Sequence, residues 1–260
     1  MVADDENRPP RPKLSVIVPV LNEAAIIGQT LTTLRCLFGT VEVIVVDGGS
    51  SDGTVDHVHR CGCRVITAPA GRGAQMHAGA VAASGEVLWF LHADTLPPPD
   101  AIEQMVHALR DPLTIGGNFS IRFDGDFAAA RFLTRLYRYL SWIGLRYGDS
   151  AYFVRRSAYF HAGGFQPFPI FEDLDLMRRL RRIGRFVRLP AVVRTSSRRF
   201  ENRSFALVFL RWTALQSLYW LGVSPARLGR WYHHVRIPGR VPVRPSSSPS
   251  PTTTPRWGNA

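Results

Sequence analysis

Two acidic residues follow apolar runs in the first hundred residues of the chain. Residues 41–46 lead into Asp47, and residues 87–91 lead into His92 and then Asp94. Runs rich in β-branched and aromatic residues predict strands of a parallel sheet, whose ligands bind beyond the carboxyl ends. Because side chains two residues apart on a strand share a face, His92 and Asp94 could share a divalent cation. The alternatives are an Asp that only begins a turn and a His that serves as a hydrogen-bonding partner.

Adjacent carboxylates occur again at Glu172 and Asp173, directly before an amphipathic segment that continues to Leu180. Acidic residues are favoured at a helix start because the helix dipole stabilises negative charge there. However, a glycine-rich stretch at residues 163–165 and a run of Pro and Phe lie just upstream. This composition predicts a loop beside a pocket, where a carboxylate could act as a general base.

A third candidate is the sequence Gly71-Arg72-Gly73, which opens a predicted helix. Backbone amides at a helix start and a guanidinium can together bind a diphosphate. Met76 occupies the third position of a G-x-G-x-x-G pattern, so the segment does not predict a dinucleotide fold.

Alternating strands and helices must position these groups. Strands are predicted at residues 14–20, 41–46, 64–67 and 87–91, and helices at 26–37, from about 52, and at 73–83. Asn22 is a candidate cap for the first helix, and small polar residues at 52–54 could cap the second. This order predicts an α/β domain with right-handed crossovers.

The second half of the chain has a different pattern. A strand is predicted at 116–123, a helix with aromatic and Arg residues at 128–145, and a short strand at 152–154. Residues 178–211 contain eleven arginines against a single acidic residue, Glu201. Such a run is typical of a solvated helix face, and the alternative is a surface for phosphate-bearing partners.

Composition sets further limits. A chain of 260 residues with 45% hydrophobic content can form one full-sized domain, and its charge of +12 favours a nucleotide, a nucleic acid or an anionic membrane as partner. The three cysteines lack C-x-x-C spacing, which fits free thiols in a reducing compartment. The amino-terminal segment has no apolar region of a secretory signal, so we expect a cytoplasmic protein.

The two ends differ in composition from the chain between them. We expect residues 1–13 and the Pro/Ser/Thr-rich residues 237–260 to be disordered, because neither can bury apolar surface. A single catalytic domain is expected over residues 14–236, with carboxyl-terminal helices from about 203.

The most apolar stretch is residues 205–223, which nevertheless contain Arg211 and Gln216. A spanning helix needs about 20 apolar residues without a central charge. We therefore expect a helix that either packs on the domain or lies at the inner face of the cell membrane. In the second case Arg227, Arg230 and Arg236 would meet anionic headgroups.

Four segments, residues 15–23, 45–54, 91–95 and 172–173, resemble a family 2 glycosyltransferase of the GT-A fold in order and spacing. The resemblance covers about residues 14–232. More narrowly, residues 71–76, 92–94, 147–149 and 195–199 resemble a small bacterial subgroup associated with radical-SAM and selenium-related genes. Some members of that subgroup are labelled carotenoid-acid glucosyltransferases.

The resemblance implies a role for each matching residue. The nucleotide-sugar pocket would be formed by Pro19, Leu21, Glu23, Asp47 and Arg72, with Asp47 on the nucleoside and Arg72 near the base or diphosphate.

Asp94 matches the last acid of the family's D-x-D motif, so with His92 it would hold Mg²⁺ or Mn²⁺ on the sugar-nucleotide phosphates. Asp173 matches the catalytic base, and Gly148, Asp149 and Glu172 fall on the acceptor side.

Several positions depart from the family patterns. His92 replaces the first Asp of D-x-D, which removes one anionic metal ligand. Ser150 and His77 stand where the subgroup usually shows Gln and often shows Asn, which bears on acceptor preference. Val208 occupies the Gln position of the Q-x-x-R-W motif of processive members, so a single transfer is expected.

The sequence therefore predicts an inverting, metal-dependent transferase that moves a sugar from a nucleotide-diphosphate sugar, with a UDP-sugar as the expected donor. The acceptor is small or lipid-linked, with a carotenoid-acid lipid as one candidate. The alternatives are a nucleotidyltransferase and a basic protein that binds nucleic acid or membrane without catalysis. Residues 19–23 lack the basic residue typical of nucleotidyltransferases, and no helix-turn-helix, RRM or zinc element predicts nucleic-acid binding.

Overall fold

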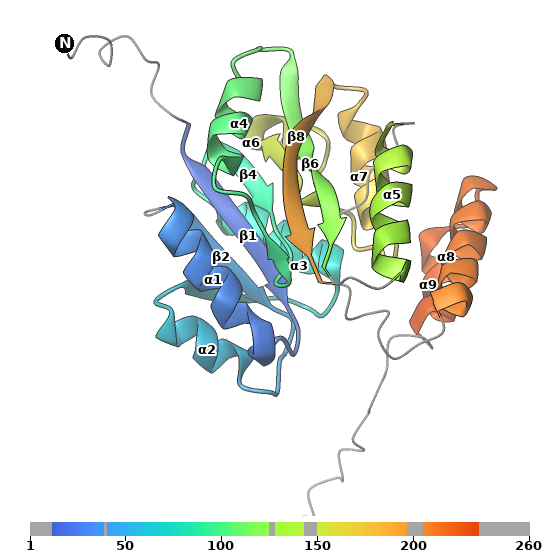
Figure 1. The fold of residues 1–260 in the computed structure, drawn as a ribbon, viewed down its shortest axis with the longest axis horizontal. Coiled ribbons are helices and arrows are strands. Elements are labelled where there is room, and N and C mark those ends of the chain that lie inside the picture. The colour runs from blue at the N-terminus through green and yellow to red at the C-terminus, as the bar shows by residue number, and fades with distance from the viewer. Residues whose placement is uncertain (1–11, 39–40, 125–127, 143–149, 197–204, 234–260) are drawn as a thin grey trace, which may run out of the picture.

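The computed structural model describes residues 12–38, 41–124, 128–142, 150–196 and 205–233. Within these ranges one eight-stranded sheet has the order β3-β2-β1-β4-β7-β6-β8-β5 (Figure 1). The strands are β1 (Leu14–Val20), β2 (Glu42–Asp47), β3 (Arg64–Thr67), β4 (Val87–Phe90), β5 (Thr95–Leu96), β6 (Thr114–Phe123), β7 (Phe153–Arg155) and β8 (Arg185–Thr195).

Helices cover both faces of this sheet. They are α1 (Ala24–Phe38), α2 (Thr54–Arg60), α3 (Arg72–Ala82), α4 (Ala101–Ala108), α5 (Ala128–Trp142), α6 (Arg156–His161), α7 (Glu172–Leu180), α8 (Phe205–Trp220) and α9 (Pro225–His233). The α/β interpretation with a mostly parallel sheet is confirmed.

The first four strands form the parallel half of the sheet, with β1 between β2 and β4. Alternate residues of β1 serve two separate cores. Val16 and Val18 pack with α1, α2 and α4 on one face, while Ile17 packs with α3, α6 and α7 on the other. Because β1 and β4 are buried on both faces, their sequences are nearly continuous apolar runs rather than alternating ones.

The arginine-rich run contains a strand, so its interpretation as a solvated helix face is wrong for residues 185–195. Strand β8 pairs in parallel with β6 over most of its length, with two register shifts. Phe186, Leu189 and Val193 face the interior, whereas Arg188 and Arg194 are exposed. Long-range pairing to β6, which lies more than sixty residues earlier, therefore outweighs the local charge pattern.

The carboxyl-terminal helices form a hairpin of α8 and α9, which lies beside α5 in Figure 1. Phe132 of α5 contacts Phe209 of α8, with ring centroids 5.8 Å apart. None of the helices in the described ranges has both the length and the hydropathy needed to cross a membrane. Disorder is predicted for residues 1–13 and 237–260, and apart from residues 12 and 13 these lie outside the described residues.

Candidate functional site

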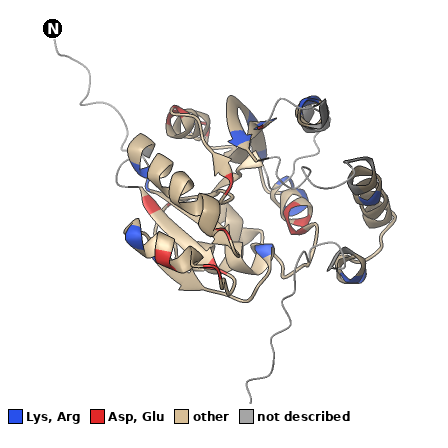
Figure 2. Cartoon of the chain, turned by 60° about the horizontal axis from the view of Figure 1, so that its bottom comes forward, with Lys and Arg blue, Asp and Glu red and all other residues tan. Residues whose placement is uncertain are grey.

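The predicted site residues gather at the carboxyl-terminal edge of the parallel strands, which Figure 2 turns toward the viewer. Pro19 pairs in register with Val46, and Val20 with Asp47, so β1 and β2 end together. Leu21 is exposed just beyond β1, and Glu23 is half-buried. This edge also receives the amino-terminal ends of α1 and α3, because each helix follows a parallel strand.

A buried glutamine braces the ends of β1 and β2. The Nε2 group of Gln75 donates to the Val20 carbonyl at 2.7 Å and to the Val46 carbonyl at 2.8 Å. Its Oε1 atom accepts from the Gly71 amide at 3.4 Å. One side chain therefore links two strand ends to the start of α3. Sequence reasoning assigned no role to Gln75, since the residues it bonds lie elsewhere in the chain.

Asp47 shapes the loop that follows β2. Its carboxylate is buried and accepts hydrogen bonds from the amides of Gly49 and Ser50 at 2.9–3.1 Å. Gly49 has φ +95°, a conformation that L side chains rarely adopt. A carboxylate has about four lone-pair sites, so these bonds leave room for a nucleoside N–H donor. The predicted contact of Asp47 with the nucleoside stays a prediction.

The loops after β1 and β2 are bound to each other. Asp52 accepts from the Thr54 amide at the start of α2 at 3.1 Å, as expected, and it also binds the start of α1. The Ala24 amide at the start of α1 donates to Asp52 at 3.1 Å, whereas Asn22 accepts from the Ser51 amide at 2.9 Å. The Glu23 amide donates to the Thr54 hydroxyl at 2.8 Å. Asn22 is therefore not the cap of α1. Asn22 has a left-handed backbone with φ 56°, and the cap is Asp52 of the loop after β2.

Desolvation raises the pKa of the Asp52 carboxyl, but hydrogen bonds from Thr54 and from the Ala24 amide outweigh it. The net result is a pKa below the ordinary value of 3.8. Asp52 is thus stabilised as a carboxylate while it holds the start of α1.

Arg72 and Glu172 meet across two helix starts. The Arg72 Nε atom lies 3.8 Å from Glu172 Oε1, and both side chains are largely buried. Gly73 permits this approach, because a Cβ atom there would lie 2.7 Å from the Gln166 carbonyl oxygen and 3.2 Å from the Glu172 Cβ. The structure therefore brings the predicted diphosphate-binding arginine beside the predicted acceptor-side carboxylate.

Asp173 follows Glu172 in the first turn of α7 and is 8% exposed. Its carboxylate accepts from the Leu174 amide at 2.8 Å. Phe171, directly before the helix, has φ 63°, which costs on the order of 1 kcal/mol for a residue with a side chain. Packing of the buried Phe171 ring against Tyr219 of α8, at 4.8 Å between centroids, holds this strained turn in place.

The loop before α7 is fixed rather than open. Arg179 of α7 pairs with Asp175 at 2.6 Å and donates to the carbonyls of Ala162 and Gly164. The Tyr159 hydroxyl accepts from the Phe165 amide at 3.0 Å and lies 3.0 Å from His77 Nδ1.

Burial is the main cause that raises the pKa of the Tyr159 hydroxyl well above its ordinary value of 10.0. This phenol therefore stays protonated and serves as a structural hydrogen-bonding group rather than as an acid–base group.

His92 and Asp94 follow β4 and are half-buried. The Asp94 carbonyl accepts from the Ser196 amide at 3.1 Å, which ties this segment to the end of β8. Among the described residues, no group of three or more His, Cys, Asp or Glu side chains could enclose a metal ion. One carboxylate and one imidazole nevertheless fit a Mg²⁺ or Mn²⁺ ion that is bound mainly by substrate phosphates and water.

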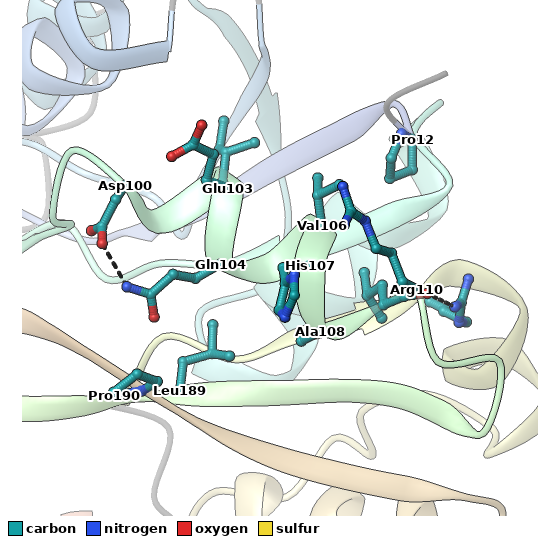
Figure 3. A pocket seen from close by; sticks show the side chains of 13 residues that line it. Pro12, Asp100, Glu103, Gln104, Val106, His107, Ala108, Arg110, Leu189 and Pro190 are labelled. Carbon is teal, nitrogen blue, oxygen red and sulfur yellow. Dashed lines mark hydrogen bonds between the residues drawn. The ribbon is translucent and has the colours of Figure 1, made fainter. Parts of the chain in front are cut away.

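Two of the predicted acceptor-side residues, Gly148 and Asp149, lie outside the described residues. A separate pocket of about 870 Å³ runs along α4 and reaches Pro12, near the start of β1 (Figure 3). None of the predicted site residues lines it. We therefore place the candidate site at the carboxyl edge and not in this pocket.

Comparisons with known proteins identify the family of the chain. A family model described as glycosyl transferase family 2 matches residues 15–165. A probable glycosyltransferase, YdaM of Bacillus subtilis, is 28% identical over 215 residues, which are 72% of this chain and 51% of that protein. An undecaprenyl-phosphate 4-deoxy-4-formamido-L-arabinose transferase of Yersinia pestis is 28% identical over 120 residues, 42% of this chain and 37% of that protein. The chain thus spans about half the length of YdaM, and less of the second.

Among solved structures, glucosyl-3-phosphoglycerate synthase from Mycobacterium tuberculosis, in complex with Mn²⁺, UDP and glucosyl-3-phosphoglycerate, shares the fold. The TM-score is 0.55 at 24% identity, over 76% of this chain and 75% of that one. The sheet order, the match over residues 15–165 and this likeness agree on the GT-A fold. The chain belongs to glycosyl transferase family 2.

Proposed function

We propose that the protein transfers a sugar from a nucleotide-diphosphate sugar to a small or lipid-linked acceptor, in one step that inverts the anomeric centre. The observation that carries the proposal is the pair of Arg72 and Glu172, with Asp173 beside it. A cation and two buried carboxylates are thereby held at the sheet edge where ligands of such folds bind.

Binding of the donor would use the start of α3 together with Arg72. The first amides of a helix have no partners within the helix, and they favour an anion at that position. A guanidinium has five N–H donors, so its contact with Glu172 through Nε is compatible with a contact to diphosphate oxygens. Pro19, Leu21, Glu23 and Asp47 would surround the nucleoside at the ends of β1 and β2.

Asp173 is the proposed general base. The charge of Glu172 is engaged by Arg72 3.8 Å away, and Asp173 is the next carboxylate in the first turn of α7. Asp173 would accept the proton of the acceptor hydroxyl while that oxygen bonds to the anomeric carbon. The bond from this carbon to the diphosphate oxygen breaks on the opposite side, so the configuration inverts. Glu172 would orient the acceptor from its place beside the base.

His92 and Asp94 are the proposed protein ligands of a Mg²⁺ or Mn²⁺ ion. When bound, the ion would stabilise the negative charge that builds on the departing nucleoside diphosphate. The related glucosyl-3-phosphoglycerate synthase binds UDP together with Mn²⁺ or with Mg²⁺, which supports this proposal. An imidazole in place of a carboxylate removes one anionic ligand, so metal binding should be weaker than at a pair of carboxylates.

UDP is the proposed nucleotide of the donor, in line with the UDP that the related synthase binds. Relatives support both acceptor classes. One is a glucosyl-3-phosphoglycerate synthase, and another is an undecaprenyl-phosphate 4-deoxy-4-formamido-L-arabinose transferase. A carotenoid-acid lipid is a candidate through the resemblance to the narrower bacterial subgroup. The proposed place of action is the cytoplasmic side of the membrane, in a domain over residues 14–236.

A thermal-shift screen of UDP-sugars and GDP-mannose, with and without Mn²⁺, tests donor binding. A ligand present at about 100 times its Kd should stabilise the fold by about 2.7 kcal/mol. We expect at least one UDP-sugar to raise the melting temperature, and more so with Mn²⁺. If no nucleotide sugar raises it, the proposed function is wrong.

The variant Asp173→Asn tests the base. We expect transfer to fall by about 10²–10⁴-fold because proton transfer is lost, while the thermal shift with the donor persists. Asp56→Asn on the exposed side of α2 is the matched control and should leave transfer unchanged. Transfer at the normal rate in Asp173→Asn would show that the base is misassigned.

A further inference from the structure

The surface formed by α5, α8 and α9 has apolar side chains without a partner in the described part of the chain. The hairpin exposes Leu207 (68%), Leu210 (67%), Trp220 (59%), Leu221 (80%) and Trp231 (57%). We call the exposed side of α5, α8 and α9 the hairpin surface. An ordinary surface helix of a soluble domain carries polar residues on its outer side.

The arrangement of these residues on α8 is regular. Residues 207, 210, 214 and 217 of α8, with residue 221 directly after it, follow one another at spacings of three and four, which places them in one stripe along the helix. The stripe reads Leu, Leu, Ala, Ser, Leu, and all five residues are exposed. The opposite side of α8 carries the buried Leu215, which packs against Ile170 and Phe171. The helix is therefore apolar on both sides, and only one side is covered by described residues.

Charge identifies what could cover the other side. The three helices contain no Asp or Glu, and Figure 2 shows basic but no acidic residues on them, at the right of the view. Their exposed arginines are Arg131, Arg135, Arg138, Arg211, Arg227 and Arg230. Apolar residues alternate here with charged residues that are all basic. Such a pattern complements a partner that has an apolar interior and a negatively charged boundary. An anionic lipid bilayer has both properties.

The aromatic residues fit the same partner. Trp220 and Trp231 are more than half exposed, and so is Tyr139 of α5 at 58%. Trp and Tyr are enriched at the boundary between headgroups and acyl chains, where an apolar ring and a polar N–H or O–H are both satisfied. No described helix could cross a membrane, so the contact would be peripheral.

We propose that the hairpin surface docks on an anionic lipid bilayer, with Trp220, Leu221 and Trp231 in the interfacial layer and the arginines on lipid phosphates.

The hairpin also packs against Phe171, which lies two residues before the proposed base. Phe171 and Tyr219 stack at 4.8 Å, and Leu228 of α9 belongs to the same buried cluster. Burial raises the pKa of the Tyr219 hydroxyl, and the charges of Asp175 and Asp173 raise it further, so this hydroxyl lies within electrostatic reach of the proposed base. Docking would then present a lipid-linked acceptor to Asp173 from the bilayer, an inference that rests on the proposed function.

Sedimentation of the full chain with phosphatidylcholine vesicles, with and without phosphatidylglycerol, tests the docking without any nucleotide sugar. We expect binding only with the anionic lipid and a loss of binding as salt is raised. In Arg227→Gln/Arg230→Gln the affinity should fall roughly tenfold or more, and in Trp220→Ser/Trp231→Ser by a similar factor. The matched controls are Arg60→Gln on α2 and Leu113→Ser before β6, both at exposed positions away from the hairpin, and they should bind like the parent.

Binding that does not depend on anionic lipid, or variants that bind like the parent, would overturn the proposal. Analytical ultracentrifugation without lipid is the second measurement, and a dimer that Leu210→Ser abolishes would show that a second copy covers this surface instead. Parent-like melting temperatures verify that the variants fold. If a UDP-sugar raises the melting temperature but the protein does not sediment with vesicles, only the docking proposal is refuted. If the protein sediments with vesicles but no nucleotide sugar raises its melting temperature, only the proposed function is refuted.

Discussion

At the scale of single residues, the candidate site depends on side chains that hold the backbone as much as on those proposed to react. Gln75 donates to two strand-end carbonyls, and Asp47 accepts from two loop amides. A buried group that loses its partner costs about 1–3 kcal/mol. The ends of β1 and β2 are thus fixed before any nucleotide is bound.

Gln75→Ala should leave the carbonyls of Val20 and Val46 without their side-chain donor. We expect a loss of roughly 2–4 kcal/mol in the free energy of unfolding, measured by urea titration. Donor affinity should fall as well, because the loop that carries Asp47 loses its support. Gln29→Ala on the exposed side of α1 is the comparison, and its stability should change much less. Equal losses in both variants would contradict the bracing role of Gln75.

Asp52 makes stability depend on acid pH. Its folded-state pKa is below the ordinary 3.8, because hydrogen bonds from Thr54 and Ala24 outweigh desolvation. Folding therefore favours the carboxylate, and this contribution is present above pH 3.8 and lost as the pH falls through the lower folded value. We expect Asp52→Asn to flatten the decline in melting temperature of the parent below about pH 4. A variant with the same acid profile as the parent would refute this assignment.

At the scale of elements, the approach of α3 to α7 depends on a position without a side chain. A Cβ at Gly73 would meet the Gln166 carbonyl oxygen at 2.7 Å, and a backbone oxygen cannot move aside cheaply. A Cβ added at Gly28 in α1 would have no atom within 4 Å. Gly73 therefore has no room for a side chain, whereas Gly28 does.

Gly28→Ala should stabilise the protein by about 0.5–1 kcal/mol, because Ala loses less conformational entropy in a helix. Gly73→Ala should instead destabilise it by roughly 1–3 kcal/mol and separate Arg72 from Glu172. Donor binding by calorimetry should weaken only in the second variant. Similar gains in stability for both variants would show that α3 can shift away from α7 without cost.

Part of this arrangement was predictable from sequence. Continuous apolar runs predicted β1 to β4, and strand-end acids predicted the edge of the sheet where they lie. Sequence reasoning missed β8, because its hydrogen bonds go to β6 and its local pattern is dominated by arginine. It also misassigned the cap of α1, since Asp52 reaches Ala24 from a loop 28 residues later. Local patterns thus predicted the elements, whereas contacts between distant segments decided the details of the site.

At the scale of the whole molecule, one residue connects the candidate active site with the carboxyl-terminal hairpin. Phe171 precedes the two carboxylates of α7, and its ring packs in the cluster formed with Leu215 and Leu228. Its positive φ persists because this packing outweighs the strain. The hairpin and the position of Asp173 should therefore respond to the same substitution.

Phe171→Ala should cost about 3–5 kcal/mol through the lost ring contacts, and α8 and α9 should exchange their amide hydrogens faster. Phe171→Gly removes the same ring but also the backbone strain, since Gly adopts this φ freely. The Gly variant should therefore be as stable as the Ala variant or more stable, by up to about 1–2 kcal/mol. If Phe171 holds both the hairpin and Asp173 in place, amide hydrogen exchange should become faster only in the hairpin, and sugar transfer should decline. A hairpin that keeps its protection in both variants would mean that it docks on the core independently of Phe171.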